Sequence, residues 1–179
     1  MTGRRRVVVT GLGAVSPVGN DVVSSWEALL AGRSGIGPIT RFDASGLGCR
    51  IAGEVKNFDL AAYMSPKEAR RMDTFIHYGI AASVQAIKDS GIEITDANRE
   101  RIGCVIGSGI GGLPMIEETA KHYYEGGPRK ISPFFVPGSI INMISGQLSI
   151  MLGLKGPSFA IVSACTTGTH SIGEAGRMI

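Results

Sequence analysis

Short apolar runs that lead into helical segments constrain the fold of this chain most. Three runs, at residues 6–10, 102–106 and 158–162, have the length and β-branched character of buried strands. Each is followed by glycines or other small residues and then by a helical pattern. Strands that alternate with helices pack as layers, with helices covering a sheet. The sequence therefore predicts an α/β fold.

The last of these runs leads to a cysteine at a strand-to-helix corner. Residues 158–168 read S-F-A-I-V-S-A-C-T-T-G, so Cys165 stands between the predicted strand and a helical segment over 166–179. The free N–H groups and partial positive charge of a helix N-terminus favour a thiolate, which is the nucleophilic form of cysteine. The alternative is a buried structural cysteine, the commoner role of a lone cysteine in an apolar run.

Length and composition indicate one ordinary globular domain. The chain has 179 residues, of which 44% are hydrophobic and 18% charged, and a net charge of +3. We find no apolar run near the ~18 residues that would span a bilayer, and no secretion signal after the basic N-terminus. The three cysteines lack C-x-x-C spacing, which argues against disulfides and a zinc site. We expect a cytoplasmic protein with no membrane or nucleic-acid partner and no metal.

Local signals predict the helix boundaries. Asn20 or Asp21 can cap a helix that stops near Gly32. Ser65-Pro66-Lys67-Glu68 forms a capping box, and the helix it opens continues to Ser90-Gly91 with a break near Asp73. We also expect a short strand within 50–55 and helices over 114–124 and 139–152. The last of these is apolar almost all round, which is typical of a buried helix.

A glycine-rich block follows the second predicted strand. Residues 107–112 read G-S-G-I-G-G, which satisfies the G-x-G-x-x-G pattern of dinucleotide sites. The acidic residue expected about 20 positions later, at a strand end, is missing, since Glu125 leads into a Gly-Gly-Pro loop. We therefore predict that these glycines allow close backbone packing and leave room for a substrate, without a nucleotide cofactor.

Two basic clusters stand out against the weak net charge. Lys67, Arg70 and Arg71 have the spacing of one helix face, and Arg129 and Lys130 lie in a proline-flanked loop. Such clusters are most often solvated surface, and the residues alone leave that alternative open.

Several blocks of this sequence resemble the β-ketoacyl-acyl carrier protein synthases, the condensing enzymes of the thiolase superfamily. The blocks are A-C-T-T-G around Cys165, R-R-V-V-V-T-G-L-G-A-V-S-P-V-G-N at 5–20, R-I-G-C-V-I-G-S-G-I-G-G at 101–112 and G-G-P-R-K-I-S-P-F-F-V-P-G at 126–138. They are similar to the elongating synthase II branch. The resemblance covers the whole chain and about the first half of that family's length. Thr167 is a small departure, because many members carry serine there.

The resemblance implies a thiolase-like layered fold (αβαβα), with residues 1–179 as most of its N-terminal half. It implies that Cys165 carries the acyl group, that Ile110 lies against the acyl chain, and that Phe135 reaches the acyl pocket of the partner in a homodimer. It implies that an acidic acyl carrier protein docks on the basic residues Lys67, Arg70, Arg71, Arg129 and Lys130. No cofactor is implied. The two histidines of the family's chemistry belong to its C-terminal half, so His77, His122 and His170 are not expected to be the general base.

Other interpretations stay open. A polyketide ketosynthase of the same branch is the nearest rival, and a chain-length-factor subunit has this fold but lacks the cysteine. A nicotinamide oxidoreductase is disfavoured by the missing acidic residue. The sequence stops inside a helix without a cap, so we expect a domain truncated before its C-terminal half and inactive by itself.

Overall fold

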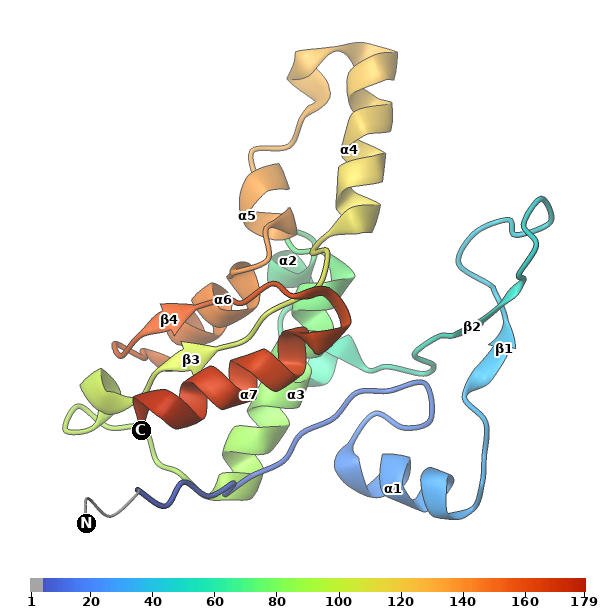
Figure 1. Cartoon of the computed structure of the whole chain (residues 1–179). Helices are drawn as coiled ribbons and strands as arrows, with labels where there is room; N and C mark the ends of the chain where they lie inside the picture. Colours follow the sequence, from blue (N-terminus) through green and yellow to red (C-terminus); the bar gives the residue numbers. More distant parts are fainter. Residues whose placement is uncertain (1–4) are drawn as a thin grey trace. The chain divides into compact units, whose positions relative to one another are not determined.

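The computed structural model describes residues 5–179, which form helices and short strands in two compact units (Figure 1). Unit 1 contains the described residues up to Val9, Met64–Ile80 and Ile92–Ile179, and unit 2 contains Thr10–Tyr63 and Ala81–Gly91. Every site residue predicted from the sequence lies in unit 1.

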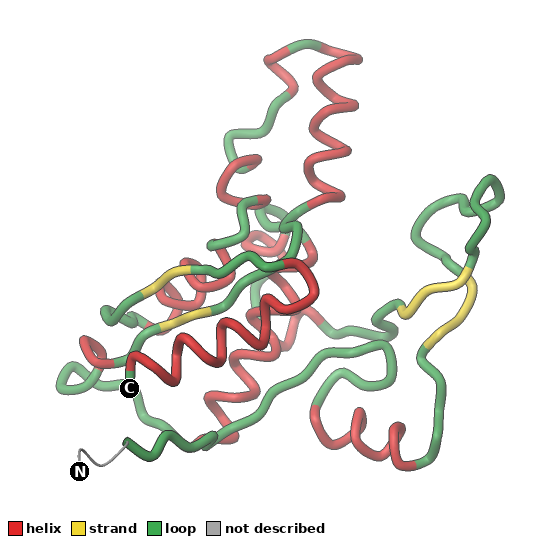
Figure 2. Tube along the Cα trace, in the orientation of Figure 1, coloured by secondary structure: helices red, strands yellow, loops and turns green. Residues whose placement is uncertain are grey.

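A parallel strand pair flanked by helices organises unit 1 (Figures 1 and 2). Strands β3 (Cys104–Val105) and β4 (Ser158–Phe159) pair with Cys104 opposite Ser158 and Val105 opposite Phe159. Helices α6 (Met143–Leu152) and α7 (Thr167–Met178) both contact this pair, and Figure 1 shows α7 in front of it and α6 behind. Parallel strands need a long crossover connection, which residues 106–157 supply. The predicted α/β fold is confirmed.

Ser145 of α6 joins the two strands from inside the unit. Its side chain is fully buried, and its Oγ accepts the Ile106 N–H at 2.9 Å and lies 3.0 Å from the Phe159 carbonyl, to which it can donate. The buried apolar side chains of unit 1 include Ile76, Ile80, Cys104, Ile144 and Leu148. Gly79 lets the helix of Ile76 approach Ile144 closely.

The capping box opens a short helix and a turn, as predicted. Helix α2 (Pro66–Ala69) has Ser65 as its N-cap, with reciprocal bonds between Ser65 and Glu68. The predicted break near Asp73 separates it from α3 (Thr74–Ser90), which ends at Gly91 with φ +67°. Only glycine adopts that left-handed conformation at no steric cost.

The crossover contains three helices and a tight turn. Helix α4 (Leu113–Gly126) leads into the 3₁₀ turn η3 (Pro128–Lys130) and helix α5 (Phe135–Ser139). The helix predicted over 139–152 is present as α6, but it begins at Met143, four residues later than predicted, because α5 ends at Ser139 and residues 140–142 are not helical. The Ser139 carbonyl accepts the Gly112 N–H at 2.9 Å instead of continuing a helical ladder. The outer side of α6 is open, with Ile150 73% exposed.

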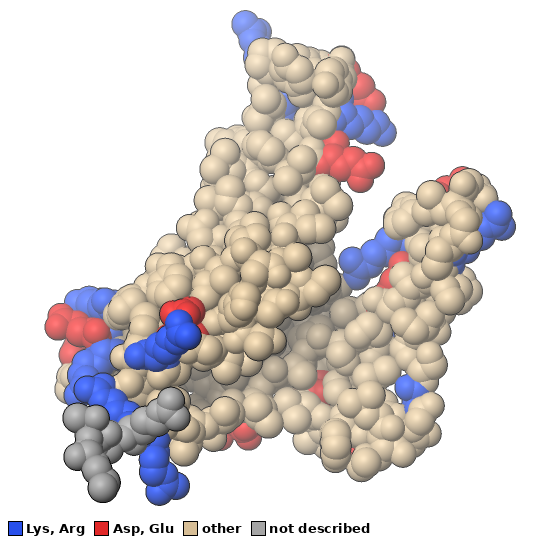
Figure 3. Space-filling view, in the orientation of Figure 1, with Lys and Arg blue, Asp and Glu red and all other residues tan. Residues whose placement is uncertain are grey.

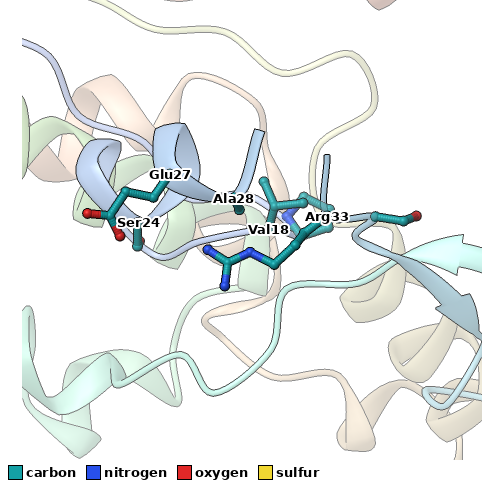
Figure 4. A pocket seen from close by; sticks show the side chains of 7 residues that line it. Val18, Ser24, Glu27, Ala28 and Arg33 are labelled. Atoms are coloured by element: carbon teal, nitrogen blue, oxygen red, sulfur yellow. The ribbon is translucent and has the colours of Figure 1, made fainter. Parts of the chain in front are cut away.

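Unit 2 contains a capped helix and a small hairpin. Helix α1 (Val22–Leu30) has Asp21 as its N-cap, and β1 (Ile36–Pro38) pairs antiparallel with β2 (Ile51–Gly53), followed by η1 (Leu60–Ala62). The cap and the strand within 50–55 are as predicted. Figure 4 shows an open cavity beside α1, lined by Pro17, Val18, Ser24, Glu27, Ala28, Arg33 and Ser34.

The predicted strand over 6–10 is absent from the structure. Val8 and Val9 are 67% and 74% exposed, and these residues pair with no described strand. A strand needs a neighbour to complete its hydrogen bonds, and β3 and β4 pair only with each other among the described residues.

The remaining short elements are 3₁₀ turns at Arg99–Arg101 (η2) and Ala164–Thr166 (η4). The helices described over residues 5–179 include none with both the length and the apolar character needed to cross a membrane.

Candidate active site

Cys165 lies at a strained corner between β4 and α7. The chain leaves β4 at Phe159, passes through the 3₁₀ turn η4, which contains Cys165, and enters α7 at Thr167. Ala164 has φ +50°, which is left-handed backbone that costs a non-glycine residue of the order of 1–3 kcal/mol. Cys165 is exposed. The predicted corner is therefore present, although the strand before it is shorter than expected.

Hydrogen bonds from α7 hold this strained corner in place. The buried Thr167 Oγ1 accepts the Ser163 N–H at 3.0 Å and donates to the Ala164 carbonyl at 2.8 Å. One turn further along α7, His170 Nδ1 lies 2.7 Å from Ser163 Oγ. These three bonds fix Ser163 and Ala164, the two residues before the cysteine, so the orientation of Cys165 depends on the start of its own helix.

The glycine-rich loop 107–112 packs directly against the corner. A methyl group on Gly107 would collide with the Ile161 carbonyl and lie 2.5 Å from Thr167 Cγ2. A methyl group on Gly109 would lie 3.4 Å from the Ala164 carbonyl oxygen. The prediction that these glycines allow close backbone packing is confirmed. Ile110, next in the chain, is 66% exposed beside the corner.

The other end of this loop is attached to the start of α4. Gly111 has φ +85°, and the Gly112 N–H donates to the Ser139 carbonyl. The Met115 N–H, in the first turn of α4, donates to Asp73 Oδ2 at 2.8 Å. A carboxylate therefore occupies the helix N-terminus that a nucleotide phosphate would need, which argues against a dinucleotide site here.

The two basic clusters lie on the surface of unit 1. Lys67, Arg70 and Arg71 are all exposed, but α2 ends at Ala69. Only Lys67 lies inside the helix, Arg70 is its C-cap and Arg71 lies beyond it, so the prediction of a single helix face does not hold. Arg70 Nε donates to the Pro66 carbonyl at 3.1 Å, and the Arg71 guanidinium lies 4.4 Å from the centre of the Phe134 ring. That distance is within the range of a cation–π contact.

Arg129 and Lys130 lie in η3, beyond the end of α4. Both are exposed, and Lys130 lines a shallow cavity with His122, Glu125 and Gly126. Phe135 is half-buried at the start of α5. Figure 3, in the orientation of Figure 1, shows few charged side chains over the middle of the visible face of unit 1.

The three cysteines differ in environment. Burial raises the pKa of the Cys104 thiol, which is 5% exposed, whereas Cys49 and Cys165 are exposed. A buried thiol of raised pKa is a poor nucleophile, so the structure favours Cys165 over Cys104 for covalent chemistry. Within residues 5–179, no group of His, Cys, Asp and Glu side chains has the arrangement of a metal site.

Residues 4–179 match the family model described as the N-terminal domain of β-ketoacyl synthase. The chain belongs to the β-ketoacyl synthase family. It is 61% identical over 176 residues to the 3-oxoacyl-[acyl-carrier-protein] synthase 2 of Vibrio harveyi, and 50% identical over 179 residues to that of Staphylococcus aureus strain N315. These alignments cover 98% and 100% of this chain, and the chain spans 42% and 43% of the two relatives' lengths.

Solved ketosynthases share the fold of this synthase domain. The ishigamide ketosynthase/chain length factor superposes with a TM-score of 0.81 at 25% identity, covering 98% of this chain and 45% of that one. A structure described as a type II PKS acyl-carrier protein in complex with its ketosynthase, AntDE:AntF, superposes with a TM-score of 0.78 at 27% identity, covering 98% and 47%.

Sequence reasoning missed three residues that build the site of this synthase domain. The sequence shows Thr167 only as a departure from serine, yet its hydroxyl bonds to Ser163 and Ala164, the two residues before Cys165. His170 was set aside as a base, and it contacts Ser163. Asp73 was noted only as a helix break. The Asp73 bond joins residues 42 positions apart, so the local sequence carried no signal for it. Thr167 and His170 bond to residues three to seven positions before them, so their polar side chains next to Ser163 and Ala164 were the available signal.

Proposed function

We propose that this chain is the nucleophile-bearing domain of an elongating 3-oxoacyl-[acyl-carrier-protein] synthase. The observation that carries the proposal is the exposed Cys165 on a strained turn directly before α7, packed against the loop 107–112. The names of the relatives and the ketosynthase fold support it. Their chains are more than twice as long, so the activity is proposed for the full-length protein.

In the first half-reaction, the acyl group moves from the carrier to Cys165, just before the start of α7. The Cys165 thiol gives up its proton and the thiolate attacks the thioester carbonyl of an acyl-carrier. The bond from the carbonyl carbon to the carrier sulfur breaks, the carrier leaves as its thiolate and takes up the proton that Cys165 released, and the acyl group remains on Sγ. The start of α7 is a region of partial positive charge, which favours an anion that forms beside it. The backbone N–H of Cys165 is assigned to the oxyanion hole, where a donor fixed before the reaction stabilises the tetrahedral intermediate.

The second half-reaction forms the carbon–carbon bond. Malonyl-carrier loses carbon dioxide, its carbanion attacks the acyl carbonyl on Cys165, and the thiolate is expelled. The product is a 3-oxoacyl-carrier two carbons longer. In the resembled family two histidines outside this sequence assist this step, so residues 1–179 by themselves are expected to be inactive. The reaction requires no redox cofactor.

The acyl pocket is assigned to Ile110 and Phe135. Ile110 follows Gly109, which lies against Ala164, so its side chain is one residue from the wall of the nucleophile corner. Phe135 would contribute to the pocket of a second copy in a homodimer. Phe159 in β4 and Val162, which follows the strand, are exposed and are suited to burial against such a copy. We propose this dimer, and a thiolase-like five-layered arrangement, for the full-length protein in the cytoplasm.

Carrier docking is assigned to the basic clusters of unit 1. Lys67, Arg70 and Arg71 are exposed, as are Arg129 and Lys130. An acidic carrier would be attracted to them from solution, and contacts of this kind act mainly on association. The acyl-carrier complex of a structural relative supports this role for the fold.

A polyketide-type ketosynthase of the same branch is the second candidate, favoured by the ketosynthase structures that superpose. The two candidates can be separated by comparing substrates of the full-length protein. Preference for saturated acyl-carriers would favour the fatty-acid synthase, and preference for polyketide intermediates would favour the polyketide-type ketosynthase. A non-catalytic chain-length factor lacks the cysteine, so Cys165 argues against it.

The test is condensation by the full-length protein with acyl-carrier and malonyl-carrier. Cys165→Ser should lose most of the activity, because an alkoxide is much harder to form than a thiolate near neutral pH. Cys49→Ser is the matched control, since Cys49 is also exposed and should be dispensable. Full condensation by Cys165→Ser would refute the proposal.

A further inference from the structure

A buried carboxylate outside the proposed chemistry lies where three segments of unit 1 meet. Asp73 is 6% exposed. Its Oδ2 accepts the Met115 N–H of α4 at 2.8 Å, and its Oδ1 accepts the Phe75 N–H at 3.4 Å. Its own N–H donates to the Gly138 carbonyl at 3.0 Å. One residue thus links the turn after α2 with the starts of α3 and α4 and the end of α5.

The junction around Asp73 has little free space. A methyl group on Gly112 would lie 3.0 Å from Asp73 Cβ and 2.8 Å from Ser139 Cα. A methyl group on Gly138 would lie 2.5 Å from the Arg71 carbonyl. Small shifts of Asp73 must therefore move its neighbours, because close-packed segments transmit displacement.

The loop that carries Ile110 is fixed at both of its ends. At one end Gly107 and Gly109 pack against Thr167 and Ala164 of the nucleophile corner. At the other end, the Gly112 N–H bonds to Ser139 and the start of α4 bonds to Asp73. Between these attachments, Ile110 is exposed and flanked by two glycines, so its position depends on the attachments and not on packing of its own side chain.

We propose that Asp73 is a positioning residue that sets the acyl-chain selectivity of Cys165 by holding the Ile110 loop. The same residue holds the turn that carries Arg71 and the end of the helix that begins at Phe135. It therefore keeps the proposed carrier surface and both proposed pocket residues in one arrangement. The inference rests on the proposed function, since selectivity has meaning only if Cys165 is acylated.

The test compares acylation of Cys165 by a short and a long acyl-carrier in the full-length protein. Asp73→Asn keeps the volume but provides one acceptor oxygen in place of two and removes the charge. The Ile110 loop should then be held less firmly, and the ratio of short-chain to long-chain loading rates should change by about tenfold, the lower end of what a pocket contact discriminates. Asp73→Ala should change the ratio further in the same direction.

Asp21→Asn is the matched control. Asp21 also caps a helix, accepting the Ser24 N–H at 2.7 Å, but it belongs to unit 2. It should lower stability without changing the ratio. A wild-type ratio in folded Asp73→Asn would overturn the inference, as would an equal change of the ratio in Asp21→Asn. Failure of wild-type Cys165 to take any acyl group would instead refute the proposed function, and the inference with it.

Discussion

Replacing Ser145 by alanine tests how the strands beneath the active site are held together. The Ser145 hydroxyl is fully buried and lies between the ends of β3 and β4, where it accepts the Ile106 N–H and donates toward the Phe159 carbonyl. Alanine has almost the same shape but offers neither bond. Both peptide groups come just before the segments that meet at Cys165.

The free-energy cost of Ser145→Ala can be worked from these two hydrogen bonds. A buried N–H left without an acceptor costs about 1–3 kcal/mol, and loss of an ordinary hydrogen bond costs about 0.5–1.5 kcal/mol. Together they lower the free energy of opening this region by about 2–4 kcal/mol. Because about 1.4 kcal/mol corresponds to a factor of ten, hydrogen exchange of the Ile106 amide should accelerate roughly 30-fold to 1,000-fold.

Hydrogen–deuterium exchange of the full-length protein, followed on the peptide that contains Ile106, measures this directly. Ser149→Ala is the matched control on the same helix, because its hydroxyl contacts Ser158 at an exposed position and its loss should cost less than about 0.5 kcal/mol. Exchange of Ile106 within twofold of wild type in Ser145→Ala would refute the reasoning.

Three further predictions concern the site and its surroundings. Arg70→Glu should raise KM for carrier-bound substrates and leave turnover of small thioesters nearly unchanged; equal losses on both would indicate damage to the fold. Ile110→Phe should slow Cys165 acylation by long chains relative to short ones by about 10–200-fold, and an unchanged chain-length profile would assign Ile110 to ordinary packing. Burial raises the pKa of the Cys104 thiol, so alkylation of Cys104 in the folded protein should need a higher pH than in the urea-unfolded protein. If the alkylation rate of Cys104 had the same pH dependence in both states, the thiol would not be buried as the structure shows.

Features encoded within a few residues could be predicted from the sequence. The capping box at Ser65 and Glu68 and the Asp21 cap were predicted because their bonding partners lie within three residues. The turn that carries Cys165 was predicted for a related reason, since a strand pattern directly adjoins a helical one. The α/β class followed from the same alternation.

Features that depend on distant partners could not be predicted. The strand expected over 6–10 has suitable residues but no described strand beside it. The helix expected over 139–152 begins only at Met143, because the Ser139 carbonyl bonds to Gly112, which is 27 positions away along the printed sequence. Arg71 has the spacing of the α2 face, yet it lies beyond the helix end and stacks on Phe134. Pattern and propensity describe neighbours in sequence, and these contacts join residues that only folding brings together.

The most direct test of the account is to locate the acyl group after the full-length protein reacts with an acyl-carrier in the absence of malonyl-carrier. Peptide mapping by mass spectrometry distinguishes Cys49, Cys104 and Cys165, which lie far apart in the sequence. The account predicts an acyl mass increment on the peptide containing Cys165, with the other two cysteines free. An acyl group on Cys49 or Cys104 with Cys165 unmodified, or no covalent adduct at all, would contradict it.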